Sequence, residues 1–314
     1  MKRIFLIVLA SFILVLCACT SAGSNPADDL PVERIVSGYY ISSSMCIALG
    51  LSDRLVGIEA RAETRPIYAM AAPQLLELPN VGTARDFNLE ACLALNPDLV
   101  ILPSRLRDVA DTLTEMDIAV ILVNPESFGE IIEMMDLVGK AAGVGERATQ
   151  LITFIESTHQ ELHALTADII KKPTVYVSGV GSWLTTAPKD MFQSSLVEMA
   201  GGLIASREIE ENSWIEISYE QLLAMNPEVI LIPAEASYEI EDILSDSAIS
   251  QIDAVKNNRI YQMPSHFEAW DSPIPASMLG AKWLLNTLHP DVYSDESLQN
   301  AIAGFYAEFY GITS

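Results

Sequence analysis

The chain has 314 residues, of which 50% are hydrophobic, and it carries a formal net charge of −24. This charge argues against a nucleic-acid-binding protein, because such proteins present basic patches to the phosphates. The hydrophobic content is typical of a globular protein, and the length is sufficient for two modest domains.

The N-terminus has the pattern of a lipoprotein signal peptide, predicted over residues 1–18. Lys2-Arg3 precede the apolar stretch 4–16, which is shorter than the about 20 residues that span a bilayer. The stretch ends in L-C-A-C, similar to a bacterial lipobox, so we expect cleavage before Cys19 and lipidation of its thiol. A plain secretory signal or an uncleaved anchor is the alternative. Residues 19–31 are small and polar, which favours a flexible tether.

Residues 32–142 alternate apolar runs with helical patterns, which is typical of a parallel α/β sheet. The predicted strands cover 34–36, 55–58, 98–102 and 119–123. The predicted helices cover 41–50, 89–95, 105–116 and 127–142. We interpret this region as an N-terminal lobe.

A linking helix is predicted within 143–171. Residues 146–170 contain neither glycine nor proline, and their apolar side chains recur at helical spacing. A helix of about 25 residues would be about 37 Å long. We interpret it as a rigid connection between two lobes.

Residues 172–314 repeat the strand and helix alternation and form the predicted C-terminal lobe. Strands are expected at 175–177, 229–232 and 260–262, and helices at 191–200, 239–252, 276–288 and 295–310. The segment 88–103 also recurs at 218–233 without a gap, at an offset of 130 residues. The two copies predict two similar lobes with a ligand cleft between them.

The two copies, the Gly201-Gly202 pair and the ending L-G-A-K-W-L-L-N-T-L-H-P-D give the chain a family resemblance. It resembles the substrate-binding lipoproteins of ABC importers for ferric siderophores, haem and cobalamin. The resemblance implies two Rossmann-like lobes, each with a mostly parallel sheet, bridged by one long α-helix. It also implies an extracytoplasmic, lipid-anchored protein that delivers its ligand to an ABC permease dimer with cytoplasmic ATPase subunits.

The resemblance assigns a role to the glutamate in each copy of the repeat. Glu90 and Glu220 match the acidic residues that dock with arginines on the two permease subunits. The alternative is purely structural, because a carboxylate at a helix N-terminus is stabilised by the helix dipole.

Loops after the strands supply the predicted ligand contacts, because ligands of α/β sheets bind beyond the carboxyl ends of the strands. The expected contacts are Tyr39, Tyr40, Arg61, Arg85, Trp183, Thr185, His266 and Trp270. Rings offer apolar area and guanidinium groups bind carboxylates, which suits a flat or anionic chelate. We therefore expect a ferric siderophore or a corrinoid and no covalently bound cofactor.

Two other ligand classes remain open. His266 could serve as an axial haem ligand, and the hydroxyl-rich loops would suit molybdate or tungstate. No bare metal site is expected, because the pair His159 and His163 fits a solvated helix face. Cys46 and Cys92 are either buried thiols or a disulfide. With no G-x-S-x-G, P-loop or G-x-G-x-x-G motif, we predict that the protein is not an enzyme.

Overall fold

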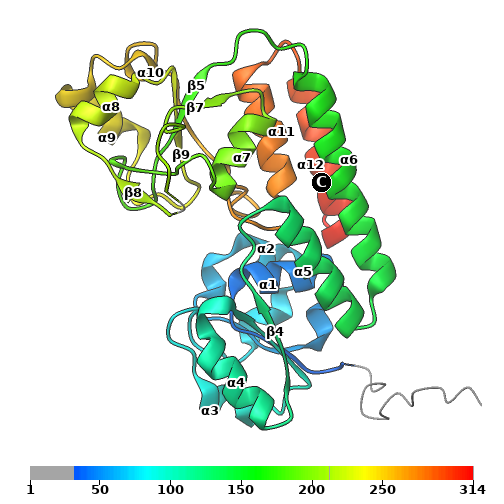
Figure 1. Ribbon diagram of the computed structural model, residues 1–314. Helices are drawn as coiled ribbons and strands as arrows, with labels where there is room; N and C mark the ends of the chain where they lie inside the picture. Colours follow the sequence, from blue (N-terminus) through cyan, green and yellow to red (C-terminus); the bar gives the residue numbers. More distant parts are fainter. Residues whose placement is uncertain (1–31, 212, 314) are drawn as a thin grey trace, which may run out of the picture. The chain divides into compact units, whose positions relative to one another are not determined.

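A computed structural model describes residues 32–211 and 213–313 (Figure 1). The described residues all belong to one compact unit of the chain. The predicted signal peptide, the tether and Cys19 lie outside the described residues.

The first lobe contains a parallel sheet with the strand order β2-β1-β3-β4. Every residue of β3 is buried, because helices cover both faces of the sheet. The strands are β1 (Ile35–Ser37), β2 (Leu55–Gly57), β3 (Leu99–Pro103) and β4 (Ala119–Val123). The helices are α1 (Tyr40–Ala48), α2 (Pro66–Ala71), α3 (Leu89–Ala94), α4 (Arg107–Glu115) and α5 (Phe128–Ala141).

The second lobe contains a parallel sheet with the order β10-β9-β5-β7, and a short antiparallel pair of β6 and β8. The strands are β5 (Thr174–Val177), β6 (Thr185–Thr186), β7 (Leu203–Ile204), β8 (Ile215–Glu216), β9 (Val229–Ile232) and β10 (Ile260–Gln262). The helices are α7 (Phe192–Met199), α8 (Tyr219–Met225), α9 (Ile240–Ser245), α10 (Asp253–Lys256), α11 (Ser277–Leu288) and α12 (Asp295–Tyr310).

The two copies of the repeated sequence form the same unit, α3–β3 in the first lobe and α8–β9 in the second. Asn96 and Asn226 both adopt left-handed backbone conformations, with φ of 46° and 39°. Asp98 then accepts hydrogen bonds from the backbone N–H groups of Glu33 and Arg34, just before β1. Glu228 accepts one from the N–H of Thr174, the first residue of β5. The second acidic position of the repeat thus ties each central strand to its neighbour.

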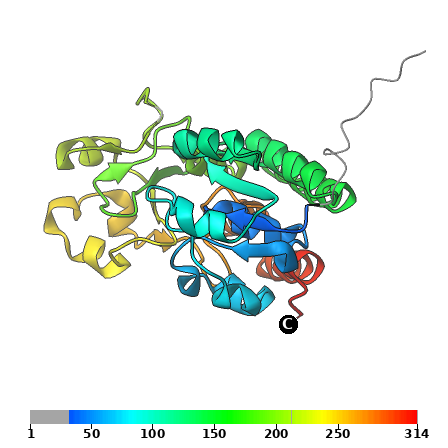
Figure 2. The same cartoon turned by 90° about the horizontal axis from the view of Figure 1, so that it is seen from below.

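The connecting helix α6 spans Gly145–Thr166, 22 residues, and lies beside α5 (Figure 2). It ends before the expected residue 170. Beyond Thr166 the chain forms a turn, and Ile169 packs against the main hydrophobic cluster. The predicted fold class, two α/β lobes joined by a long helix, is confirmed.

The C-terminal helix α12 also links the lobes. It lies alongside α6 (Figure 1), with the Phe154 ring centroid 4.7 Å from that of Phe305 and 5.8 Å from that of Phe309. It also contacts α1, where the hydroxyls of Ser44 and Tyr310 are 3.5 Å apart. Two helices, rather than α6 alone, therefore hold the lobes together.

The expected helix at 239–252 is interrupted. The structure has α9 up to Ser245, then a single 3-10 turn over Ser247–Ile249. The side chain of Asp246 accepts a hydrogen bond from the N–H of Ala248 and caps that turn. A local side-chain cap therefore ends the helix where the apolar periodicity continues.

Both cysteines of the described part are free and buried. Cys46 belongs to the main hydrophobic cluster and Cys92 to a separate cluster of the first lobe. Of the two alternatives for these cysteines, the structure has buried thiols. No helix within residues 32–313 is both long and apolar enough to cross a membrane.

Candidate ligand-binding site

A cavity of about 150 Å³ lies where the carboxyl ends of the two parallel sheets face each other. Tyr40 follows β1 in the first lobe, and Ala234 and Ser265 follow β9 and β10 in the second. The lining residues are Tyr40, Ser44, Thr64, Arg65, Pro66, Ile67, Tyr68, Ala234, Glu235, Ser265, Phe267, Glu268 and Ala269. The location is the one expected for a ligand of parallel α/β sheets.

Contacts between the lobes close this cavity. The Arg65 guanidinium forms an ion pair with the Glu235 carboxylate and lies 4.1 Å from the Tyr40 ring centroid. The backbone N–H of Ile67 donates to the carbonyl of Phe267 at 3.1 Å. A ligand larger than the cavity must break these contacts, since drug-sized ligands occupy about 300–1,000 Å³.

On the first-lobe side a buried carboxyl group, that of Glu59, lies behind the cavity wall. Its side chain is 6% exposed. It accepts hydrogen bonds from the Ser43 hydroxyl at 2.5 Å and the Tyr68 hydroxyl at 2.7 Å. Burial raises the pKa of Glu59, and the two hydrogen bonds act in the opposite direction.

On the second-lobe side Glu268 lines the cavity itself. It is 7% exposed, accepts a hydrogen bond from the Ser44 hydroxyl of the other lobe, and lies 3.4 Å from the Tyr306 hydroxyl of α12. Burial raises the pKa of Glu268 to about 7, with the hydrogen bonds opposing the shift. The pKa of the Asp271 carboxyl, which accepts from the N–H of Ala234, is raised by desolvation to about 6.

The four contacts predicted in the first lobe take different places. Tyr40 lines the cavity, and Tyr39 packs edge-on against it with ring centroids 5.9 Å apart. Arg61 and Arg85 are exposed and do not line the cavity. Arg61 has a left-handed backbone and Arg85 lies in a turn capped by Thr83.

The four contacts predicted in the second lobe are also dispersed. Trp183 packs in a cluster of that lobe, 5.4 Å from Tyr238, and Thr185 pairs in β6. His266 is exposed, next to the lining residue Phe267. Trp270 is 4% exposed, and its indole N–H donates to the Tyr306 hydroxyl at 2.8 Å.

Trp270 therefore belongs to the core in this structure, because its side chain is buried and Tyr306 of α12 accepts from its only polar group. A Cβ at Gly280 of α11 would come within 2.7 Å of the Trp270 carbonyl, which shows how closely the helix approaches. The ligand roles predicted for all eight residues remain predictions.

Sequence reasoning missed the carboxyl groups at the cavity, those of Glu59, Glu235 and Glu268. All three follow strands of the two sheets, so their loop positions were a usable signal. The burial of Glu268 was not readable, because it depends on residues such as Ser44, 224 positions away.

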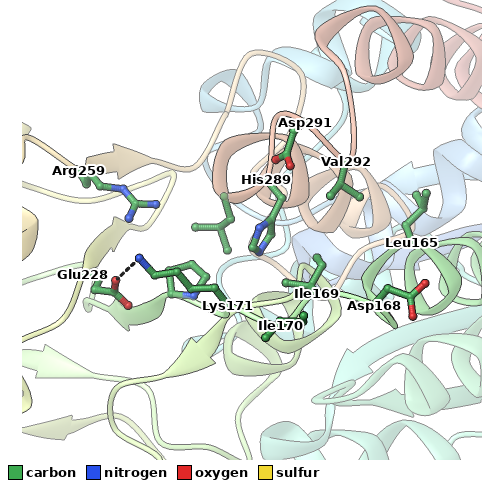
Figure 3. Close-up of a pocket in the computed structure, with 12 residues that line it drawn as sticks. Leu165, Asp168, Ile169, Ile170, Lys171, Glu228, Arg259, His289, Asp291 and Val292 are labelled. Carbon is green, nitrogen blue, oxygen red and sulfur yellow. Dashed lines mark ion pairs between the residues drawn. The ribbon is translucent and has the colours of Figure 1, made fainter.

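A larger cavity, of about 530 Å³, lies at the opposite edge of the second sheet. Pro173, Glu228 and Arg259 there precede β5, β9 and β10. Figure 3 shows Lys171 directed toward the carboxylate of Glu228, at 3.9 Å. His289 caps the end of α11. This is the amino edge, so we do not assign the ligand to it.

No cluster of three or more metal-binding side chains occurs in the described part of the chain. The predicted docking residues Glu90 and Glu220 are both exposed, each at the second position of its helix. The N-cap side chains of Asn88 and Ser218 hold these helix starts. A hydrogen bond with Ser218 lowers the pKa of Glu220.

Comparison with known proteins identifies the class. The periplasmic binding protein family matches residues 35–267, and the chain belongs to this family. The predicted family is confirmed, and with it the general function of a solute-binding protein of ABC importers.

Curated relatives differ in the ligands that they are named for. The molybdate-binding protein MolA of Haemophilus influenzae is 22% identical, covering 89% of this chain and 86% of the relative. The substrate-binding lipoprotein YvrC of Bacillus subtilis is 24% identical, with 84% and 82% covered. A vitamin B12-binding protein of Salmonella typhimurium is 25% identical, with 81% and 90% covered.

Solved structures show the same fold. A periplasmic solute-binding protein from Veillonella parvula superimposes with a TM-score of 0.81, at 26% identity, covering 90% of this chain and 89% of that one. Molybdate-bound MolA superimposes with a TM-score of 0.80, at 20% identity, covering 90% and 94%.

Proposed function

We propose that the protein captures a metal chelate, a ferric siderophore or a corrinoid, in the cavity between its lobes. The observation that carries this is the set of aromatic side chains at the carboxyl edges of both sheets, above all Tyr40 from the first lobe and Phe267 from the second. Such rings bury apolar ligand area at little entropic cost. The named ligands of the relatives, which include vitamin B12, support the proposal.

The chelate is larger than the closed cavity, so binding requires the lobes to part at the Arg65–Glu235 ion pair. The helices α6 and α12 span both lobes, which restricts opening to a small rocking motion rather than a wide hinge. The ligand leaves chemically unchanged, since the role of the site is binding and not catalysis.

We further propose that the two permease subunits of the importer dock on Glu90 and Glu220. The same place in two equivalent α–β units suits a partner with two equivalent subunits. The N-terminal signal and Cys19 favour an extracytoplasmic protein held to the membrane by a lipid anchor.

A thermal-shift panel tests the ligand class, with cobalamin, ferric hydroxamates, ferric catecholates, haem and molybdate as probes. A probe present at 100 times its Kd stabilises the protein by about 2.7 kcal/mol. Tyr40→Ala and Phe267→Ala should weaken the bound chelate, whereas Tyr261→Ala in β10, which does not line the cavity, serves as the control. No stabilisation by any chelate would contradict the proposal.

The second candidate is an oxyanion of the molybdate class. The small volume of the cavity, about 150 Å³, and the likeness to molybdate-bound MolA favour it. Stabilisation by molybdate alone in the same panel would establish this candidate instead.

A further inference from the structure

We infer that the cavity selects solutes that are neutral or cationic at the buried face and discriminates against anionic ones. This inference rests on the proposed function and specifies the charge class of the chelate. It differs from the expectation of an anionic ligand that arginine residues in the loops suggested. Three features of the cavity carry it.

The first feature is the balance of charged groups. Among the described residues that line the cavity, Arg65 carries the one positive charge, and Glu235 and Glu268 carry carboxyl groups. The positive charge of Arg65 is already paired with Glu235, and one side of its guanidinium is covered by the Tyr40 ring. The one positive charge of the described lining is therefore already paired with a carboxylate and is not free to bind an anion.

The second feature is a further layer of acidic groups. Glu59 touches the lining residue Tyr68, and Asp271 touches the lining residue Ala234. Each lobe therefore places a carboxyl group behind its own wall. In their ionised forms, and at short range in a poorly hydrated site, these groups repel an anion more strongly than they would in water.

The third feature is the use of the hydroxyl donors. An oxyanion site needs free hydrogen-bond donors. Here Ser43 and Tyr68 donate to Glu59, and Ser44 donates to Glu268. An anion would have to compete with internal carboxylates for the same donors, whereas a ligand with N–H or ammonium groups finds acceptors already in place.

A series of ferric chelates of different charge tests the inference. The probes are ferrioxamine B, a monocation, ferrichrome, which is neutral, and ferric enterobactin, a trianion, with molybdate as a small dianion. Affinities come from tryptophan fluorescence titration of the purified protein, cross-checked by calorimetry at low and high salt. We expect affinity to fall by about tenfold for each added negative charge, and the differences to shrink at high salt.

Two variants locate the effect. At pH 8, above the raised pKa of Glu268, Glu268→Gln removes the buried negative charge. Glu235→Gln removes the more exposed negative charge and keeps the core intact. Each variant should reduce the ratio of affinities for cationic over anionic chelates by about tenfold, which corresponds to 1.36 kcal/mol. Glu241→Gln, exposed in α9, is the matched control and should leave the preference unchanged.

The outcomes separate the two proposals. Tightest binding of the trianionic chelate, or an unchanged preference in both variants, overturns the inference and leaves the metal-chelate function in place. Absence of binding by all three chelates and by cobalamin overturns the proposed function and the inference with it. Falling affinity with negative charge, reduced by the two variants, supports both.

Discussion

The two lobes share one scaffold but bring different chemistry to the cavity. Their sheets have matching strand orders, β2-β1-β3-β4 and β7-β5-β9-β10, and the central strands are tied by equivalent carboxylates. Yet the first lobe contributes most of the hydroxyl groups and Arg65, while the second contributes Phe267, Glu235 and Glu268. The shared scaffold thus positions the cleft, and the loops beyond the strands determine what binds in it.

Variants of the proposed docking residues test the equivalence of the two lobes most directly. Glu90→Arg together with Glu220→Arg should reduce ligand uptake by about tenfold or more, because under the proposed docking each reversal would place a cation against a permease arginine. Uptake by cells and ATPase stimulation in vesicles measure this effect. Each single reversal should have a similar, smaller effect if the lobes dock equivalently.

The matched control for docking is Glu115→Arg, an exposed acidic residue at the end of α4. It should transport like the wild type. Normal uptake by the double variant, with unchanged ligand affinity, would show that these glutamates serve only their helices.

The lobes also differ in how they hold their cavity loops. The second lobe anchors its loop with the buried Trp270, whereas the first uses the Tyr68–Glu59 hydrogen bond. Trp270→Ala should lower the free energy of unfolding by about 3–5 kcal/mol, and Tyr68→Phe by about 1–3 kcal/mol, in urea denaturation. If Trp270→Ala loses little stability but no longer binds the ligand, Trp270 is a ligand contact, as the sequence predicted, and not a core residue.

The buried carboxyl groups predict a pH dependence of stability. The native pKa of Glu268 is raised from 4.5 to about 7, so the folded protein binds more protons than the unfolded one between these values. The free energy of unfolding should therefore fall as pH rises from about 5 to 8, by at most about 3 kcal/mol from this group. Asp271 acts in the same direction at lower pH, since its pKa is raised from 3.8 to about 6.

Urea denaturation at a series of pH values measures this slope. Glu268→Gln should flatten it, and Glu59→Gln in the first lobe should also flatten it, because burial raises that pKa too. Exposed Glu241→Gln is the control. A slope that is the same in all three variants would mean that folding raises the pKa of neither buried carboxyl group.

The smallest expected effects compare the two helix starts of the repeat. Asn88→Ala and Ser218→Ala each remove an N-cap and should cost about 1 kcal/mol. Ser218 should cost more, because it belongs to a reciprocal capping box with Gln221. Ser250→Ala, exposed and bonded only to the nearby Ser247 carbonyl, should change stability by less than about 0.5 kcal/mol. Equal losses of stability in Asn88→Ala and Ser218→Ala would show that the capping box adds nothing to the second helix start.

Much of the fold could be predicted because the signals are local. Buried strands such as β3 appear as continuous apolar runs, and the Asn-Pro pairs at 96–97 and 226–227 end their helices. The break at Asp246 was missed, because a single capping side chain outweighed the apolar periodicity there. The extra link through α12 was also missed, because helix amphipathicity does not reveal which lobe covers the apolar face.

The predicted contacts and the lining of the cavity overlap only in part. The rule that ligands bind beyond the strand ends directed attention to these loops, and Tyr40 lines the cavity. The rule does not distinguish a loop residue that is buried in the core from one that lines the cavity. Trp270 is buried, whereas Phe267, three residues earlier, lines the cavity. The direction of a loop side chain depends on elements that arrive from distant parts of the chain.

The sequence alone determined the two-lobed α/β architecture, the repeat and the general class. Apolar runs of strands, residues that end helices and the repeated motif all depend on residues that are adjacent in the sequence. Only the tertiary structure decided the chemistry of the cleft. Ser44 and Glu268 lie 224 positions apart, and their meeting converts an ordinary loop glutamate into a buried, hydrogen-bonded acid. The burial and the hydrogen bonding of a side chain depend on residues that are distant in the sequence, and only folding brings those residues together.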